Sequence, residues 1–361
     1  MNMYNNKKPL LVVPNFSALF QVMFAGALND NILKNALLVL LTFSHYTIFN
    51  LASEQVVNLA VLLFLLPYFL FSSYAGKLAD CSNKVKMIQI IKFCEIIIML
   101  FAVLGFFGHI VWLLLLALFA MGVHSTFFGP IKYSIIPQYL PRNNLVMAMG
   151  YIEMGTFIAI LCGQSAGSWF MANNYLLLLL IVLVGVSVFG YAMSLKMTHV
   201  PPSSTKVRFY KNIFKDTYLM YRSVTKNKTI SKNLHAISWF WGFGVIFTTQ
   251  LPILTRDYFG GDARVFSLIV TLFTLGIGLG SIVCAKLSRG MALPKYVVWG
   301  ASGMSVGYFI LLLTHRHILT TSPQWMNFLT SSDGMLILIA CLAIGIVAGF
   351  YSVTCYNEMQ L

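Results

Sequence analysis

Polar and ionisable residues interrupt an apolar stretch near the start of the chain. The segment GALNDNILKNALLVLL, residues 26–41, carries a carboxylate at Asp30, an amide at Asn31 and an ammonium at Lys34. A carboxylate inside an apolar segment can bind a cation or a proton, and an ammonium can bind a phosphate as a point charge. Asp30 and Lys34 are four residues apart, so a helix would place them on one face. Two roles stay open for this pair, which are substrate binding and an internal ion pair that fixes packing.

The composition indicates the environment that surrounds this segment. Of the 361 residues, 58% are apolar and 9% are charged, and the mean hydropathy is +0.80. A soluble domain has about 25% charged residues, so the chain is predicted to be an all-α integral membrane protein. Stretches of roughly 20 mostly apolar residues, long enough to cross a bilayer core, recur along it. Ten membrane helices are predicted, at residues 17–44, 55–76, 87–108, 110–131, 144–170, 174–196, 234–256, 265–287, 294–314 and 334–357.

The formal net charge of +14 comes from residues that gather in alternate loops. With the N-terminus inside, the loops predicted to be cytoplasmic contain 19 of the 24 lysines and arginines, and the outer loops contain three. This bias follows the positive-inside rule and predicts a multi-pass protein with a cytoplasmic N-terminus. The basic balance therefore indicates topology and contact with anionic lipid headgroups, and no nucleic-acid partner is expected.

One long hydrophilic segment divides the predicted helices into two groups. Residues 1–196 are predicted to form an N-terminal six-helix bundle, residues 197–233 a basic cytoplasmic linker, and residues 234–361 an incomplete C-terminal bundle of helices 7–10. The linker either forms a short amphipathic helix on the inner membrane surface or is disordered. Two related halves are common in secondary transporters. Because two repeats of six helices make twelve, a fragment without its last two helices is favoured over a ten-helix design.

The sequence GKLADCSNKVKM, residues 76–87, follows the second predicted helix. It resembles the G-x-L-A-D-R-x-G-R-K signature of the major facilitator superfamily, with matches from Gly76 to Asp80 and with Lys84 at a basic position. The resemblance implies a two-bundle fold and a cytoplasmic latch formed by Gly76, Asp80 and Lys84. In the superfamily this carboxylate lies near the N-terminal end of helix 11, whose partial positive charge attracts it. An ordinary basic turn is the alternative.

Further stretches narrow the resemblance to the lysophospholipid transporter family. Asp30 and Asn31 match an acidic pair in the first helix of that family. The sequence TFFGPIKYSIIPQYL, residues 126–140, resembles the end of its fourth helix. Residues 238–252 and 260–290 resemble its seventh and eighth helices. The nearest resemblance is to members that are fused ahead of an acyltransferase.

This resemblance implies a secondary transporter that flips lysophospholipids, chiefly lysophosphatidylethanolamine, across the bacterial inner membrane for reacylation. Such a substrate carries an ammonium, a phosphate and one acyl chain. Asp30 is expected to pair with the ammonium, and Lys34 or Lys132 with the phosphate. The expected partners are the lysophospholipid, membrane lipids and an acyltransferase that acts on the delivered substrate. The other predicted substrate-binding residues are Asn31, Tyr133, Glu153, Trp239, Trp241 and Gln250.

Several of these residues have a second role that stays open. Lys132 at a helix end also fits a side chain that snorkels to lipid headgroups. Trp239 and Trp241 also fit anchors at the membrane interface. Glu153 fits a cavity residue, a proton site or a partner for Lys34.

Outside this predicted site, Lys92 and Glu95 lie three residues apart in the third predicted helix, and a structural ion pair is expected there. The six cysteines are scattered without a C-x-x-C pair, so neither a metal site nor a cofactor is expected.

Two other functions compete with lysophospholipid transport. A proton-coupled antiporter for amphipathic drugs would use Asp30 or Glu153 as its proton carrier. A membrane-embedded acyltransferase is less favoured, because no histidine of the chain has an aspartate five residues later, as the glycerolipid acyltransferases require. The chain is therefore not expected to be an enzyme.

Overall fold

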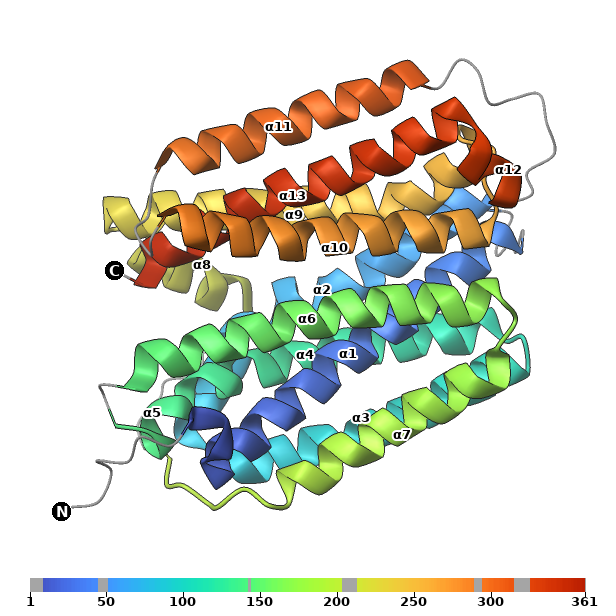
Figure 1. Cartoon of the computed structure of the whole chain (residues 1–361). Helices are drawn as coiled ribbons and strands as arrows, with labels where there is room; N and C mark the ends of the chain where they lie inside the picture. Colours follow the sequence, from blue (N-terminus) through green and yellow to red (C-terminus); the bar gives the residue numbers. More distant parts are fainter. Residues whose placement is uncertain are drawn as a thin grey trace. The chain divides into compact units, whose positions relative to one another are not determined.

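The computed structural model describes the chain except for residues 1–8, 45–50, 142–143, 203–212, 289–293, 315–324 and 361. Ten long α-helices account for most of the described residues, which confirms the predicted all-α membrane fold (Figure 1). They are α1 (Pro14–Phe43), α2 (Ser53–Cys81), α3 (Lys84–Phe107), α4 (Val111–Ser134), α6 (Leu145–Ala172), α7 (Leu176–Ser194), α9 (Lys228–Asp257), α10 (Ala263–Ser288), α11 (Pro294–Leu313) and α13 (Ser332–Gln360). The shorter helices are η1 (Leu10–Val12), α5 (Ile136–Tyr139), α8 (Ile213–Val224) and α12 (Trp325–Thr330).

Nine of the long helices in the described part of the chain are both long and apolar enough to cross a membrane. The exception is α1, whose amides and charges between residues 29 and 35 lower its hydropathy. The helix that departs from the apolar pattern is therefore the one that carries the candidate site.

The helix boundaries follow local signals, and the largest departures from the predicted ends are the end of α2 and the start of α9. Asn83 begins α3, and its side chain accepts a hydrogen bond from the backbone N–H of Lys86 at 3.1 Å. The chain turns between α3 and α4 at Gly108, and His109 adopts a positive φ of 53°. α2 extends beyond its predicted end at residue 76, because no helix-breaking residue occurs before the Asn83 cap. Gly76 and Asp80 therefore lie in the last turns of α2 and not in the turn that follows it.

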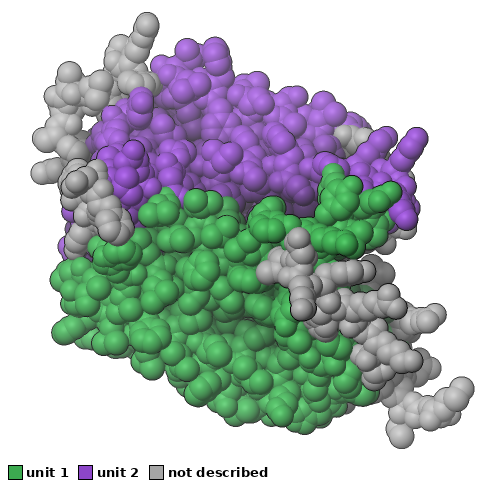
Figure 2. Space-filling model, turned by 180° about the vertical axis from the view of Figure 1, so that it is seen from behind, with its two compact units in different colours: residues 1–34, 59–163, 176–223 green, residues 35–58, 164–175, 224–361 purple. Residues whose placement is uncertain are grey.

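The chain divides into two compact units, which Figure 2 colours separately. Unit 1 comprises residues 1–34, 59–163 and 176–223, and unit 2 comprises residues 35–58, 164–175 and 224–361. The helices α1, α2 and α6 each contribute residues to both units. The predicted division into bundles at residues 1–196 and 234–361 stays a prediction.

In unit 1, α3 packs against α4 on one side and α7 on the other. The core of this unit includes the buried side chains of Phe16, Leu19, Met23, Ile88, Ile131 and Ile152. The segment that follows α7 is fastened to the same unit, since Tyr139 donates to the carbonyl of Thr198 at 2.9 Å. Burial raises the pKa of Tyr139 to about 12, so its phenol stays neutral and able to donate.

In unit 2, charged and polar side chains tie α9 to the second half of α1 and the start of α2. Arg256 pairs with Glu54 and with Asp257, and it donates to the carbonyl of Thr42 at 2.6 Å. The ring of Phe43 lies 6.3 Å from that of Phe266 in α10. These contacts explain why residues 35–58 belong to unit 2.

Glycines allow α10 and α13 of unit 2 to pack with their backbones close together, and the two helices lie side by side in Figure 1. Gly276 and Gly280 form a G-x-x-x-G pattern on α10, and Gly345 and Gly349 form another on α13. A β-carbon at any of the four would lie closer than 3.0 Å to backbone atoms of the other helix. Without water between membrane helices, close van der Waals packing of this kind is a main source of association.

Gly280→Ala should therefore destabilise the protein, because the new methyl group meets the backbone of Ile346. We expect the free energy of unfolding in detergent to fall by about 1–3 kcal/mol, read as a lower Tm. Gly278→Ala is the matched control, because a β-carbon there has no atom within 4 Å. The control should keep its Tm or raise it, since alanine has the higher helix propensity. Equal Tm values for the two variants would contradict this account of the packing.

Candidate functional site

The polar residues of α1 point toward different neighbours, because successive helical residues are rotated by about 100°. Asn29 is fully buried, and its amide donates to Glu95 Oε1 of α3 at 3.0 Å and to the Leu183 carbonyl of α7 at 3.2 Å. Asn31 is also buried, and its amide donates to the carbonyl of Ala27 one turn earlier at 2.8 Å. Asn29 therefore binds neighbouring helices, while Asn31 hydrogen-bonds within α1.

Asp30 points toward α4 and is half-buried. Its Oδ2 accepts from the Ser125 hydroxyl at 2.6 Å, while its Oδ1 has no hydrogen-bond donor among the described residues. Lys34 lies one turn later, and its Nζ is 5.8 Å from the ring centre of Phe64. The alternative role, an internal ion pair, does not occur among the described residues, because no contact within 4.0 Å joins Asp30 to Lys34. Lys34 and Asp30 interact electrostatically without direct contact.

Three more of the predicted residues meet where α4 packs near α6. The Tyr133 hydroxyl donates to Glu153 Oε1, which joins the two helices. The ammonium of Lys132 lies 4.7 Å from the ring centre of Tyr133. It interacts electrostatically with Glu153 and with Asp30. Unit 1 thus places Asp30, Lys34, Lys132, Tyr133 and Glu153 in one electrostatic neighbourhood. Their roles in substrate binding stay predictions.

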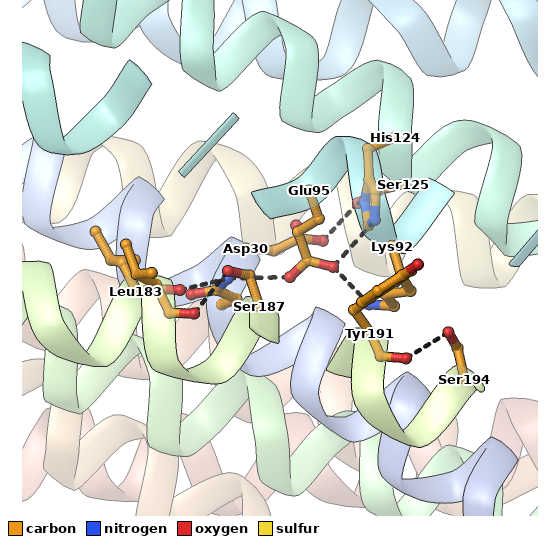
Figure 3. A network of polar contacts seen from close by, with 11 residues as sticks. Asp30, Lys92, Glu95, His124, Ser125, Leu183, Ser187, Tyr191 and Ser194 are labelled. Atoms are coloured by element: carbon orange, nitrogen blue, oxygen red, sulfur yellow. Dashed lines mark hydrogen bonds and ion pairs between the residues drawn. The ribbon is translucent and has the colours of Figure 1, made fainter. Parts of the chain in front are cut away.

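A buried charged group that the sequence analysis identified only in part lies beside Asp30. Glu95 Oε2 is 2.6 Å from Lys92 Nζ and 3.1 Å from His124 Nε2, so a histidine joins the expected lysine–glutamate pair (Figure 3). Lys92 and Glu95 are completely buried, and His124 is 5% exposed. The space for the lysine exists because Gly26 of α1 presents no side chain to it, since a β-carbon there would lie 2.4 Å from Lys92 Nζ.

The position of His124 beside Glu95 could have been predicted from the α3–α4 hairpin. The helices α3 and α4 are antiparallel neighbours joined by a short turn at Gly108. Glu95 and His124 lie at nearly equal distances along the chain from this turn, so they occur at the same depth.

The predicted site residues of unit 2 have other partners. Trp239 stacks on Phe243 with ring centres 5.3 Å apart, and it is 48% exposed. Trp241 is 40% exposed. Gln250 donates to Asn58 Oδ1 at 2.9 Å, so its amide nitrogen is already engaged. The roles predicted for these three residues also stay predictions.

Two of the three residues predicted as a latch border a cavity of about 540 Å³ in unit 1. Gly76 and Asp80 line it together with the linker helix α8. Asp216 of α8 is buried, and its carboxylate pairs with Lys77 and accepts from the Ser73 hydroxyl at 3.3 Å. Lys84 is buried and interacts electrostatically with Asp80. A linker acid, which the sequence analysis did not single out, therefore contacts the end of α2.

The opposite face of α8 is apolar and exposed. Phe214, Tyr218 and Tyr221 recur at helical spacing, and each is about half exposed or more. Asp216 projects from the other side of the helix, into the cavity. A short amphipathic helix therefore occurs in the predicted linker.

Comparison with known proteins agrees with this architecture. Residues 15–359 match a sequence model of the Major Facilitator Superfamily. A protein named lysophospholipid transporter LplT from Klebsiella pneumoniae subsp. pneumoniae is 25% identical over 284 residues, which cover 77% of this chain and 68% of the relative. A protein of the same name from Photorhabdus laumondii subsp. laumondii is 23% identical over 341 residues, which cover 94% of this chain and 81% of the relative. The resemblance to lysophospholipid transporters is thereby confirmed.

Solved structures share the fold at low sequence identity. A bacterial homolog of the human lysosomal transporter Spinster, in an inward-facing and unoccupied conformation, matches with a TM-score of 0.63 and 19% identity. This match covers 98% of the present chain and 76% of the other. The POT family transporter PepTSo matches with a TM-score of 0.56 and 15% identity over 95% of this chain and 84% of the other. From the match of its sequence over nearly its whole length, the chain belongs to the Major Facilitator Superfamily.

Proposed function

We propose that this protein is a secondary transporter that flips lysophospholipids, with lysophosphatidylethanolamine as the preferred substrate, across a bacterial inner membrane for reacylation. The named relatives support this substrate class, and the membrane helices support a multi-pass location. An acyltransferase that consumes the delivered lipid and a cytoplasmic N-terminus are parts of the same proposal. The assignment of the ammonium and the phosphate of the headgroup rests on residues of this chain.

The observation that carries the proposal is the unpaired Oδ1 of Asp30. A buried acceptor without a donor is rare in folded proteins, and a ligand cation is one group that satisfies it. An ammonium donates up to three hydrogen bonds and carries the matching charge. The ethanolamine end of the substrate is therefore assigned to Asp30.

The nearby lysines fit the other end of the headgroup. Neither Lys34 nor Lys132 forms an ion pair within 4.0 Å with any described residue. Together with Asp30 and Glu153 they give a neighbourhood of two positive and two negative formal charges. A zwitterion with one ammonium and one phosphate adds no net charge to such a site, so it is better matched than a purely cationic drug.

Asp30→Asn tests the assignment of the ammonium. Reconstituted into liposomes, this variant should take up a fluorescent lysophosphatidylethanolamine at least about 10-fold more slowly, since hydrogen bonds to charged groups contribute about 1.5–3 kcal/mol. Asp333→Asn, an identical change in the first turn of α13, should leave uptake unchanged. Both variants should elute as folded protein at the wild-type position in gel filtration. Normal uptake by Asp30→Asn would remove Asp30 from the site.

Lys132→Ala tests the assignment of the phosphate. The apparent KM for lysophosphatidylethanolamine should rise by about 10-fold, while the amount of protein inserted in the membrane stays normal. Lys295→Ala is the control, because Lys295 also lies over the ring of the following tyrosine, at 5.4 Å. A fall in insertion without a change in KM would identify Lys132 as a lipid anchor and not as a phosphate ligand.

A further inference from the structure

The group Lys92, Glu95 and His124 places more charge inside the helices than packing alone requires. Glu95 Oε1 accepts a hydrogen bond from Asn29, and Oε2 accepts one from Lys92 and lies 3.1 Å from His124 Nε2. A carboxylate with a donor at each oxygen and an ammonium beside it is stable as an anion. Lys92 and Glu95 therefore cancel each other's charge, and the ionisation of His124 is the remaining variable of the group.

The tautomer of His124 follows from this arrangement. An ionised Glu95 only accepts hydrogen bonds, so the imidazole nitrogen that faces it, Nε2, carries a hydrogen in both charge states. The other nitrogen, Nδ1, is thus the one that gains or loses a proton. It lies 3.4 Å from the hydroxyl oxygen of Ser125.

Ser125 connects this nitrogen to the candidate substrate site. Its hydroxyl oxygen is 2.6 Å from Asp30 Oδ2 and 3.4 Å from His124 Nδ1, and Figure 3 shows the three side chains together. A hydroxyl both donates and accepts, so it can transmit a proton between its two neighbours. The chain of contacts therefore runs from Asp30 through Ser125 to His124, and from there to Glu95.

We propose that Asp30, Ser125 and His124 form a binding site for one exchangeable proton beside the Lys92–Glu95 ion pair, and that a cationic headgroup at Asp30 displaces this proton. The second clause rests on the function proposed above. The first clause rests on the geometry of unit 1 alone.

The proton can reside on Asp30 or on His124 Nδ1, and the Ser125 hydroxyl contacts both groups in either case. With Asp30 protonated, its O–H donates to the Ser125 oxygen, whose own O–H donates to His124 Nδ1. Transfer breaks the Asp30 O–H bond as Ser125 gains that proton, and breaks the original Ser125 O–H bond as Nδ1 gains the other. The result is an Asp30 carboxylate and a His124 imidazolium, with no change in net charge.

Charged and titratable groups from each neighbouring helix act on this site. Lys34 of α1 and Lys132 of α4 interact electrostatically with Asp30, and so does Tyr68 of α2, which also hydrogen-bonds Ser125. Lys92 and Glu95 come from α3.

The groups of α7 that are described in contact with Asn29 and Lys92 carry no charge. This helix gives the Leu183 carbonyl, which accepts from Asn29, and Gly190 lies in ordinary contact with Lys92.

Counting charges shows why a cationic headgroup would displace the proton. The carboxylates of Asp30 and Glu95 balance two cations, which are Lys92 and a protonated His124. The ammonium of the substrate adds a third positive charge beside Asp30, while the phosphate lies toward Lys34 or Lys132, so the repulsion acts locally on the protonated His124. Loss of the His124 proton restores neutrality. Binding of the substrate and release of a proton are then two sides of one exchange.

The first arm of the test needs no substrate. Infrared spectra of the reconstituted protein, recorded against pH, should contain a carboxylic acid band that Asp30→Asn abolishes. His124→Asn removes the alternative place for the proton, so the band should persist to a pH higher by about 1 unit, a change of about 1.4 kcal/mol. Ser125→Ala should shift the band in the same direction and leaves the Lys92–Glu95–His124 contacts intact. Ser305→Ala, on α11, is the control and should leave it in place.

An unchanged midpoint in both His124→Asn and Ser125→Ala, or no Asp30 band at any pH, would overturn the shared-proton site. Should His124→Asn fail to fold, Ser125→Ala alone decides.

The second arm measures protons released on binding. Calorimetric titrations in buffers of different ionisation enthalpy should give close to one proton per lysophosphatidylethanolamine at a pH below the midpoint, where the free site is fully protonated, and about half a proton at the midpoint. The number should fall toward zero with lysophosphatidylglycerol, which lacks the ammonium. Binding without proton release in the wild type would overturn the displacement. Absence of any binding would refute the proposed function, and the infrared arm would still decide the proton site.

Discussion

A carboxylate buried between membrane helices costs several kcal/mol unless donors surround it, and Glu95 is surrounded at both oxygens. The side chains that contact it, Asn29, Lys92 and His124, come from α1, α3 and α4, so one carboxylate helps to fix how these helices face each other in unit 1. With Asn29 held by Glu95 and by α7, the next residue of α1 must point elsewhere. The orientation of Asp30 toward Ser125 is a consequence of this arrangement.

The helical architecture could be predicted from hydropathy because each membrane helix must satisfy its own backbone hydrogen bonds. All ten predicted segments occur as helices, and their ends differ where a cap was not considered, as at Asn83. The polar positions of α1 were likewise visible, since charges in an apolar run are conspicuous. The chemistry of Asp30 and Lys34 could be read from their types and spacing.

The partners of those residues could not be read in this way. Whether Lys34 pairs with Asp30 depends on rotamers and on neighbours from other helices, and in the described residues no such pair forms. His124 and Ser125 lie far from Asp30 in sequence, and only the α3–α4 hairpin and its packing on α1 join them. Asp216 was one acid in a basic linker, and nothing local indicated that it reaches Lys77.

Two features of unit 1 lie next to each other, a carboxylate acceptor and a buried charged group. Asp30 provides an acceptor without a donor, and the buried group behind it offers a place for the proton that this acceptor gives up. A site of this kind distinguishes headgroups by the presence of an ammonium, whatever the length of the acyl chain.

The most direct measurement is a structure of the protein in lipid nanodiscs with lysophosphatidylethanolamine bound. The account predicts the ammonium within about 3 Å of Asp30 Oδ1, the usual length of a charge-assisted hydrogen bond, with the phosphate toward Lys132 or Lys34. A headgroup bound elsewhere, with Asp30 Oδ1 still unpaired, would contradict it.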